Sequence, residues 1–328
     1  MVGVFRLYET GGPEVLQWET VDLPPPGPGE VTLKHEAIGL NFTDIYARSG
    51  LYPATLPSGL GQEGAGVVTA IGEGVTEVAV GDRVAYAGGP LGAYAEARNL
   101  PAALLVKLPS FLSSQVAASM LLRGLTVQYL LRQTYKVQAG DNVLIHTAAG
   151  GVGLIASQWA KALGARVIGT VGSAAKADLA RNHGCDEVLV LDELKEAGAL
   201  SQKVKALTGG EGVAVVYDAI GKDTFFESLD CLRPLGMMVS YGNASGPVPP
   251  FSPLELTKRG SLFFTRPSLA TYTRKRELLL PMAAELFAMI ESGQVKIEVG
   301  QSYPLKDAPR AQQDLAGRRT TGGTVLLP

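Results

Sequence analysis

The chain has 328 residues, enough for about two domains at roughly 150 residues each, and 46% of its residues are hydrophobic. Its formal net charge of −2 excludes a general electrostatic attraction to nucleic acid or to an anionic membrane. The amino-terminal sequence lacks the charged and then apolar segments of a secretion signal, and no apolar run approaches the length of a membrane span. We therefore expect a cytoplasmic protein without membrane insertion and without a nucleic-acid partner.

The first predicted domain, residues 1–122, consists of short alternating strands separated by Gly and Pro turns. The clearest strand patterns are VTLKHEAIGLN at 31–41, GAGVVTAIG at 64–72 and GDRVAYAG at 81–88. The segment PPPGPGE, residues 24–30, is typical of a turn. This pattern predicts an all-β, partly closed domain.

In the second predicted domain, residues 123–265, strands alternate with helices. The apolar runs are continuous, as is typical of strands that helices cover on both faces. The expected strands are 142–147, 165–171, 187–191, 213–221, 237–242 and 261–265. Six parallel strands in this arrangement predict the doubly wound α/β sheet of the Rossmann fold.

A glycine-rich turn follows the first strand of this domain. Gly151, Gly153 and Ala156 fit the dinucleotide fingerprint GxGxxA, and they lie between an apolar strand and an amphipathic helix. The glycines allow a tight turn and a close approach to a pyrophosphate, which the N–H groups at the start of the helix then bind. We expect Gly150, Gly151 and Val152 to contact the cofactor. The alternative is a tight turn without a ligand.

The last predicted segment, residues 266–328, begins with an amphipathic helix over 276–292. Two short strands, 294–299 and 324–328, flank a helix that begins near Asp307. These strands have too little core of their own, so we expect them to return to the amino-terminal β domain. The active site is then expected in the cleft between the two domains.

Several motifs together resemble the medium-chain dehydrogenase/reductase superfamily. They are GLGQEGAGVVTAIGEGVTEVAVGDRV at 59–84, GLT at 124–126, AAGGVG at 148–153 and TRPSL at 265–269. More narrowly, the chain resembles the zeta-crystallin branch of zinc-free NADPH:quinone oxidoreductases, and bacterial quinone oxidoreductases above all. The resemblance implies a GroES-like catalytic domain, a Rossmann NADPH-binding domain and a homodimer formed through the sixth Rossmann strand.

The zinc ligands of related alcohol dehydrogenases are replaced in this chain. Those enzymes have a Cys ligand just before a Thr-Asp pair and a His ligand in a Gly-His-Glu motif, and the corresponding residues here are Asn41 and Gln62. Glu63 remains, but one carboxylate cannot hold the metal, so we predict no catalytic metal. The other metal-ligating side chains have no ligand spacing and are expected to be structural: His35, His146, His183, Cys185 and Cys231.

Without a Lewis acid, the substrate must accept hydride readily, as an electron-poor quinone does. The candidate catalytic residues lie in NFTDIYARSGLY and are Asn41, Asp44, Tyr46 and Tyr52. The tyrosines can stack on a flat ring, and the amide or phenol can donate to a quinone oxygen. By resemblance, Asn41 and Tyr46 approach the nicotinamide and the substrate. The alternatives are that the tyrosines only pack and that Asp44 caps a helix that starts at Ile45.

The residues after the second Rossmann strand favour NADPH over NADH. An NAD-specific fold has an acid about 20 residues after the first glycine, but this chain has Gly172 and Ser173 there. Lys176 and the Ser173 hydroxyl can bind a 2′-phosphate, although Lys176 is alternatively a solvated helix charge. By resemblance, Arg318 helps to close the phosphate site. The chain departs from related enzymes at Leu191, where they have a tyrosine, so its coenzyme preference is expected to be looser.

Further cofactor contacts are implied only by the resemblance: Thr126, Tyr241, Gly242, Asn243, Phe264 and Arg266. Tyr241 and Phe264 are alternatively core residues. The function that these observations predict is NADPH-dependent reduction of quinones. An NADPH-dependent enoyl or alkenal reductase is the alternative, and a non-enzymatic RNA-binding or structural role is the second one.

Overall fold

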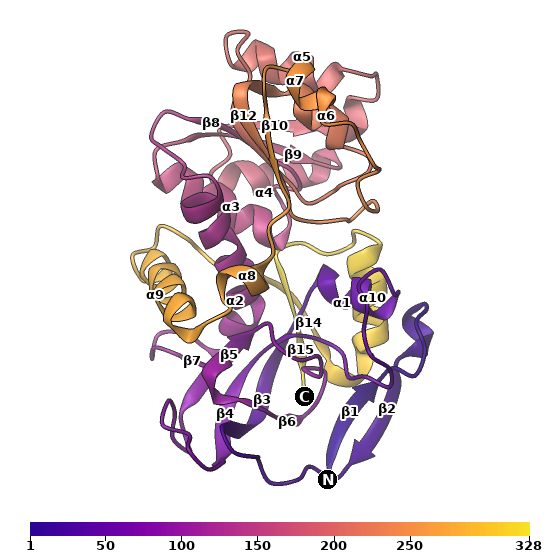
Figure 1. Ribbon diagram of the computed structural model, residues 1–328, viewed down its shortest axis with the longest axis vertical. Coiled ribbons are helices and arrows are strands. Elements are labelled where there is room, and N and C mark those ends of the chain that lie inside the picture. Colours follow the sequence, from indigo (N-terminus) through magenta and orange to yellow (C-terminus); the bar gives the residue numbers. More distant parts are fainter. The chain divides into compact units, whose positions relative to one another are not determined.

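The computed structural model describes residues 1–328, and the chain divides into two compact units (Figure 1). Unit 1 contains Met1–Leu125, Tyr272–Ala284 and Ile297–Pro328. Unit 2 contains Thr126–Thr271 and Glu285–Lys296. Helices α2 (Ser114–Tyr129) and α9 (Arg276–Glu291) contain boundaries between these ranges, and α8 is Leu269–Tyr272.

Unit 1 is built on a seven-stranded sheet with the order β14-β15-β3-β4-β5-β7, and β6 also pairs with β3. Along β3, alternate side chains from Val31 to Ala37 are buried, as expected for a strand with one face on the core. The strands of the sheet are β3 (Glu30–Leu40), β4 (Glu63–Ile71), β5 (Arg83–Ala87), β6 (Ala97–Pro101), β7 (Val106–Lys107), β14 (Val299–Pro304) and β15 (Gly323–Leu327). Unit 1 also holds the hairpin β1 (Val2–Arg6) and β2 (Gln17–Val21) and the helices α1 (Phe42–Arg48) and α10 (Ala308–Ala316).

The carboxyl-terminal strands belong to this same sheet. β15 pairs antiparallel with β3 and parallel with β14, so that the yellow end of the ribbon lies beside indigo β3 in Figure 1. The strand expected at 294–299 was placed wrongly, because β14 begins only at Val299. The backbone N–H of Val295 donates to Met289 O at 3.0 Å, and that of Lys296 to Gln158 Oε1 at 2.8 Å. These residues therefore close the end of α9 instead of joining a sheet.

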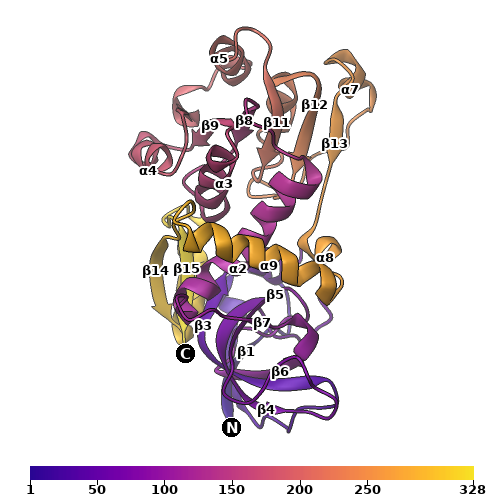
Figure 2. The ribbon, with the colours of Figure 1, turned by 90° about the vertical axis from the view of Figure 1, so that its left-hand side faces the viewer.

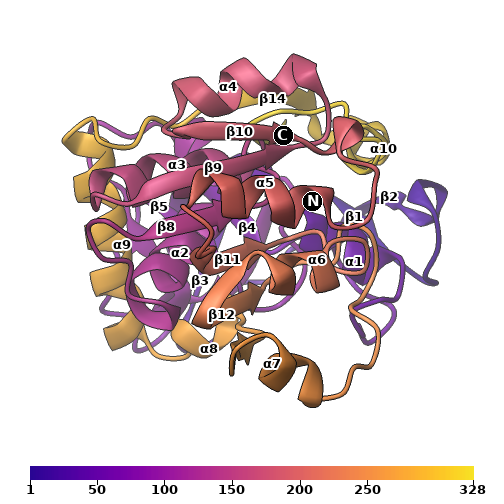
Figure 3. The same cartoon turned by 90° about the horizontal axis from the view of Figure 1, so that it is seen from above.

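Unit 2 is the predicted doubly wound sheet, and its fold class is confirmed. Six parallel strands have the order β10-β9-β8-β11-β12-β13, and Figure 3 shows β10 to β12 in this succession. The strands are β8 (Asn142–Ile145), β9 (Arg166–Val171), β10 (Glu187–Val190), β11 (Val213–Asp218), β12 (Leu232–Ser240) and β13 (Phe263–Thr265). In chain order this is 3-2-1-4-5-6, the arrangement typical of dinucleotide-binding sheets.

Five helices accompany this sheet. They are α3 (Gly151–Ala162), α4 (Ala177–Asn182), α5 (Ala199–Leu207), α6 (Phe225–Asp230) and α7 (Leu254–Lys258). α3 and α4 lie beside β8 and β9, as Figure 2 shows. α4 also contacts β10, and α5 packs beside α6. No helix of the structure combines the length and apolar character that crossing a bilayer requires.

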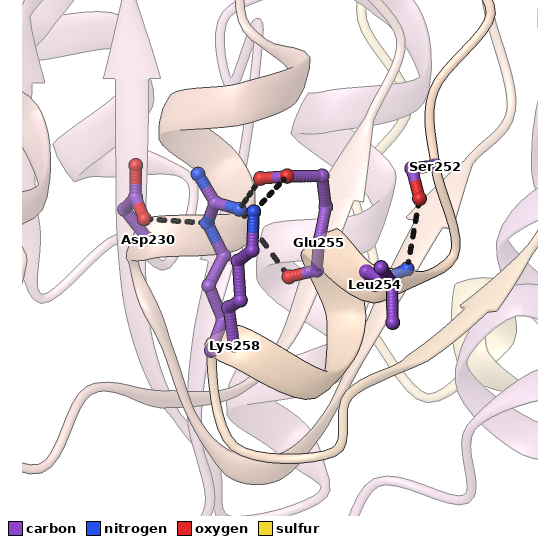
Figure 4. A network of polar contacts seen from close by, with 6 residues as sticks. Asp230, Ser252, Leu254, Glu255 and Lys258 are labelled. Atoms are coloured by element: carbon purple, nitrogen blue, oxygen red, sulfur yellow. Dashed lines mark hydrogen bonds and ion pairs between the residues drawn. The ribbon is translucent and has the colours of Figure 1, made fainter.

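Charged side chains connect the short helix α7, which precedes the edge strand β13 in the chain, to the end of α6. Arg259 forms ion pairs with Asp230 and Glu255, and Lys258 pairs with Glu255 at 3.0 Å (Figure 4). The N–H of Leu254, the first residue of α7, donates to Ser252 Oγ at 3.3 Å. The connection between β12 and β13 therefore has polar contacts at the start of α7, from Ser252, and at its end, from Arg259.

Candidate active site and cofactor site

Helix α1 of unit 1 contains two of the four candidate catalytic residues, Asp44 and Tyr46, and a third, Asn41, is its N-cap residue. The helix begins at Phe42, after the extended Asn41, and not at Ile45 as the sequence suggested. Asp44 is therefore the third helical residue, and its Oδ2 accepts from the backbone N–H of Asn41 at 2.9 Å. Asp44 is therefore not the N-cap residue that the alternative expected, but it takes part in a capping box with Asn41, and the helix starts three residues earlier.

The side-chain amide of Asn41 is held by a buried acid. Asn41 Nδ2 donates to Glu63 Oε2 at 2.7 Å, and the N–H of Leu122 donates to Glu63 Oε1 at 2.7 Å. A Cβ atom at Gly39 would lie 2.2 Å from Glu63 Oε2, so only glycine leaves room for this carboxyl group. Burial raises the pKa of Glu63, and the nearby Arg123 guanidinium opposes that shift.

Asp44 is completely buried behind this pair. Its Oδ2 also accepts from Tyr94 Oη at 3.0 Å, and Tyr94 Oη in turn accepts from Gln312 Nε2 at 3.2 Å. Asp44 Oδ1 has no hydrogen-bond partner. Burial raises the pKa of Asp44 to about 7, although the two hydrogen bonds lower it. These contacts are those of a capping residue, so a catalytic role of Asp44 stays a prediction.

The aromatic candidates contact one another. Tyr46 is buried, with 7% of its surface exposed, and its ring meets the Tyr52 ring edge to face at 5.1 Å between centroids. The ring centroids of Phe42 and Tyr46, both on α1, are 6.1 Å apart. Tyr46 and Tyr52 are therefore brought together in unit 1, and Asn41 is the N-cap residue of the same helix. Their contact with a substrate stays a prediction.

The side-chain amides at both replaced zinc positions are hydrogen-bonded within the protein. Gln62 donates from Nε2 to Gly89 O at 2.7 Å, and Asn41 is bonded to Glu63. No three His, Cys, Asp or Glu side chains of the chain gather as a metal-binding group. Buried His35 is used structurally, between Ala95 O at 2.7 Å and Tyr86 Oη at 3.0 Å, and burial lowers its pKa to about 4.

In unit 2 the glycine-rich turn presents backbone N–H groups. Gly150 is the N-cap residue of α3, and no side chain caps this helix, so its first-turn N–H groups can receive an anion. A Cβ atom at Gly153 would lie 2.3 Å from Thr147 O and 2.7 Å from Ala148 Cα. The turn therefore packs tightly on the strand end, and its first residues fit a pyrophosphate.

The loop after β9 contains Gly172, Ser173 and Lys176, with no acid among residues 171–176. The structure adds a neighbour that sequence reasoning missed. The backbone N–H of Asp192 donates to Gly172 O at 3.2 Å, so the exposed residue Asp192 lies beside this loop. Leu191 packs, partly buried, against the core of unit 2 and presents no polar group.

The loop after β12 lies against the loop after β11. A Cβ atom at Gly242 would come within 2.4 Å of Ala219 O, and the amide of Asn243, oriented to satisfy both its atoms, accepts from Arg266 Nη2 at 3.2 Å. These loops and the glycine-rich turn all follow the carboxyl ends of parallel strands, the edge at which such sheets bind ligands. Tyr241 follows β12 directly.

Three other predicted cofactor residues have different surroundings. Phe264 packs edge to face on Phe225 at 5.6 Å and on Phe251 at 5.3 Å, which agrees with the core alternative. Thr126 is buried on α2. Arg318 follows α10 in unit 1 with a φ of 57°, so its contact with a cofactor stays a prediction.

Comparison with known proteins shows the family. Residues 27–110 match an alcohol dehydrogenase GroES-like domain, and residues 151–279 match a zinc-binding dehydrogenase domain. The chain is 54% identical to the quinone oxidoreductase of Pseudomonas aeruginosa over 319 residues, or 97% of each chain. The protein belongs to the quinone oxidoreductases of the medium-chain dehydrogenase/reductase superfamily.

Solved structures of quinone oxidoreductases have the same fold. The Escherichia coli quinone oxidoreductase, crystallised with NADPH, matches with a TM-score of 0.96 at 48% identity, over 99% of this chain and 100% of that one. A 2-haloacrylate reductase from a Burkholderia species is 45% identical over 100% of this chain and 99% of its own length. The predicted combination of a GroES-like domain and a Rossmann sheet is confirmed.

Sequence reasoning did not identify the contacts that two residues make near the candidate site residues. Glu63 was considered only as a metal ligand, and its bond to Asn41 depends on the pairing of β3 with β4. His146 was expected to be structural, and its buried ring contacts Thr170 and Ser228 immediately before the glycine-rich turn in the sequence. A histidine next to the fingerprint motif was the only signal in the sequence.

Proposed function

We propose that this protein reduces quinones to hydroquinones with NADPH. The observation that carries the proposal is its similarity, over nearly the whole chain, to quinone oxidoreductases, one of which was crystallised with NADPH. A quinone, one hydride and one proton give one hydroquinone, and the new aromatic ring favours the reaction. Such an acceptor needs positioning more than a Lewis acid.

The chain's own residues fit the cofactor. The N–H groups of Gly151 and Val152 at the uncapped start of α3 would bind the pyrophosphate, and Gly150 leaves the approach open. Lys176 and Ser173 would hold the 2′-phosphate, and Arg318 would assist them. NADPH supplies the hydride when bound. Gly172, Asn243 and Arg266 follow the strand ends at which the nucleotide would lie.

Asn41 is the residue we assign to the quinone. Glu63 accepts one N–H of its amide and thereby fixes the amide plane, while the second N–H can donate to a quinone oxygen. Tyr46, on the helix that Asn41 caps, and Tyr52 would provide the aromatic surface. The expected position of this site between the two domains stays a prediction, as does the cytoplasmic location.

The proposed reaction uses no metal. Support comes from the carboxamides Asn41 and Gln62, which occupy the former ligand positions and are hydrogen-bonded within the protein. Active enzyme is expected to contain substoichiometric zinc by elemental analysis and to keep its activity after exhaustive dialysis against a chelator. One zinc ion per active chain, lost together with activity, would overturn this mechanism.

A panel of acceptors tests the proposed function. Initial rates of NADPH oxidation should be compared for benzoquinone, naphthoquinone, phenanthrenequinone, an alkenal and 2-chloroacrylate, with the rate without enzyme subtracted. We expect kcat/KM for at least one quinone to exceed that for either unsaturated substrate. Turnover of the alkenal or of 2-chloroacrylate alone would reject quinone reduction.

The second candidate is reduction of an activated carbon-carbon double bond. The 45% identical relative named 2-haloacrylate reductase favours it, because that protein spans essentially the same length. The same cofactor residues serve both reactions, and the two differ only in the acceptor. The same panel therefore separates them.

We also propose a homodimer that forms through β13. This strand is at the edge of the six-stranded sheet and pairs only with β12. Phe263 on it is 55% exposed, an unusual state for a large apolar side chain at a sheet edge. Pairing with β13 of a second copy would cover this edge.

A further inference from the structure

Four buried side chains of unit 2 form a hydrogen-bonded chain next to the glycine-rich turn. His146, which directly follows β8, has Nδ1 2.9 Å from Thr170 Oγ1 and Nε2 2.9 Å from Ser228 Oγ. Ser228 Oγ also lies 3.2 Å from Asp218 Oδ2. None of these four residues has any exposed surface. They come from the ends of β8, β9 and β11 and from α6.

The donor and the acceptor of each bond in this hydrogen-bonded chain can be assigned by starting from the Asp218 carboxylate, which only accepts. The Asp218 carboxylate accepts from Ile220 N at 2.6 Å, Gly221 N at 3.0 Å and Thr224 Oγ1 at 2.7 Å. Ser228 has one hydroxyl hydrogen, and it is donated to the same carboxylate. Ser228 must then accept from Nε2–H of His146, and in a neutral ring Nδ1 accepts from the Thr170 hydroxyl.

The surroundings keep this ring uncharged. Burial lowers the pKa of His146, and the charged groups that face it, Asp218 and Glu227, only partly oppose this effect. A neutral imidazole with Nε2–H satisfies all the hydrogen bonds in one direction, from Thr170 to Asp218. The opposite tautomer would place two hydrogens between Nδ1 and Thr170 unless that hydroxyl turned away, and would leave no hydrogen between Nε2 and Ser228.

The same chain connects the loops that we assign to NADPH. Thr170 lies two residues before Gly172, and its carbonyl oxygen accepts from the N–H of Ala148 in the glycine-rich turn at 2.8 Å. At the other end, Asp218 holds the loop after β11. In that loop Ile220 O accepts from the N–H of Ser245, in the loop after β12, at 2.8 Å. The loops after β8, β9, β11 and β12 are therefore linked through one ring.

We propose that His146, as the neutral Nε2–H tautomer, is a positioning residue for the dinucleotide site. It fixes the loops after β8 and β9 relative to the loop after β11, so that the phosphate-binding N–H groups are preorganised. The inference rests on the proposed function, because these are the loops assigned to NADPH. It assigns no chemical step to His146.

Removal of the Thr170 hydroxyl tests the positioning role. Thr170→Val keeps the side-chain volume and leaves Nδ1 of His146 without a donor, whereas Thr170→Ser keeps the hydroxyl. We expect the Kd for NADPH, measured by calorimetry, to rise at least fivefold in Thr170→Val and to stay within twofold of wild type in Thr170→Ser. The kcat at saturating NADPH should change less than the Kd.

Thr208→Val is the matched control, because this hydroxyl donates to Val204 O at the end of α5, far along the chain from these loops. It should lower stability without changing the Kd. A wild-type Kd in folded Thr170→Val would overturn the proposal. If that variant does not fold, Ser228→Ala, which breaks the link to Asp218, is measured in its place with the same criterion.

Histidine ¹⁵N spectra of the wild-type protein test the tautomer without any variant. The chain has three histidines, and the signals absent from His146→Gln identify the ring. We expect a neutral Nε2–H ring at pH 7.5, with and without NADPH, and a pKa below the ordinary histidine value of 6.5. A Nδ1–H tautomer, or titration near pH 6.5, would overturn the assignment. If wild-type protein does not bind NADPH, the proposed function fails, whereas the spectra still report on the ring.

Discussion

At the scale of single residues, Asp44 is a carboxyl group whose proton affects folding. Burial raises its pKa from 3.8 to about 7, so between these values the folded protein holds a proton that the unfolded chain has lost. The contribution to the free energy of unfolding is complete below pH 4 and is lost as pH rises to 7. The loss is at most about 4 kcal/mol, at 1.4 kcal/mol per pKa unit.

Asp44→Asn should remove this dependence. The wild-type Tm minus the Tm of the variant is expected to fall by several degrees between pH 4 and 7 and to stay constant above pH 8, measured by calorimetry. Asp178→Asn is the control, because 89% of the Asp178 side chain is exposed. Parallel Tm curves for wild type and Asp44→Asn would show that Asp44 is ionised in the folded protein throughout this range.

Lys176 is the residue on which coenzyme preference should depend most. Because its ammonium would bind only the 2′-phosphate, Lys176→Ala should raise the KM for NADPH about tenfold and the KM for NADH less than twofold. Lys205→Ala, at an exposed position of α5, is the control and should change neither value. An equal rise for both coenzymes would mean that Lys176 does not read the phosphate.

Single residues also show how far the site could be predicted from sequence. Gly150 to Gly153 lie at the turn that the fingerprint predicts, because the motif is local in the chain. The partners of Asn41 could not be predicted. Glu63 reaches it through the pairing of β3 with β4, and no spacing in the sequence encodes that contact. Asp192 lies beside Gly172 for the same reason, since adjacent strand ends bring them together.

At the scale of elements, the close packing of α3 on the end of β8 sets the position of the glycine-rich turn. Gly153→Ala would place a Cβ atom 2.3 Å from Thr147 O, so the helix or the turn must shift. We expect a loss of about 1–3 kcal/mol in stability and a Kd for NADPH several times higher. Ala162→Ser, at an exposed position of the same helix, should change neither quantity.

If Gly153→Ala bound NADPH as tightly as wild type, close packing at this turn would not control the cofactor site. Chemical denaturation and calorimetric titration of the same preparations measure both effects. A lower stability with an unchanged Kd would assign Gly153 to the fold alone.

Strands and helices with continuous apolar patterns were predicted well, but their ends were not. All six strands of unit 2 lie within the predicted segments or overlap them, because each is buried and strongly apolar. The start of α1 differs from the expected one. The helix begins at Phe42 because Asp44 accepts from the N–H of Asn41, whereas the sequence pattern indicated a start at Ile45. The alternation from Val295 to Val299 resembles a strand, but Val295 is bonded to the end of α9.

At the scale of the whole molecule, the exposed edge of unit 2 determines the predicted assembly. Phe263→Lys would place a charge on β13, where pairing with a second copy is proposed. We expect sedimentation velocity to show a dimer for wild type and a monomer for the variant. Phe226→Lys, at a 40% exposed position on α6, is the control and should stay dimeric. A monomeric wild-type protein would reject the homodimer.

Quinone reduction by the whole enzyme can be measured in one anaerobic experiment. Enzyme and a known amount of NADPH are mixed with excess 1,4-benzoquinone, and NADPH absorbance and hydroquinone are followed together, with a sample lacking enzyme beside it. We predict enzyme-dependent oxidation of NADPH with one hydroquinone formed per NADPH consumed. No enzyme-dependent oxidation of NADPH by this or any other quinone, while an alkenal is reduced, would contradict the account.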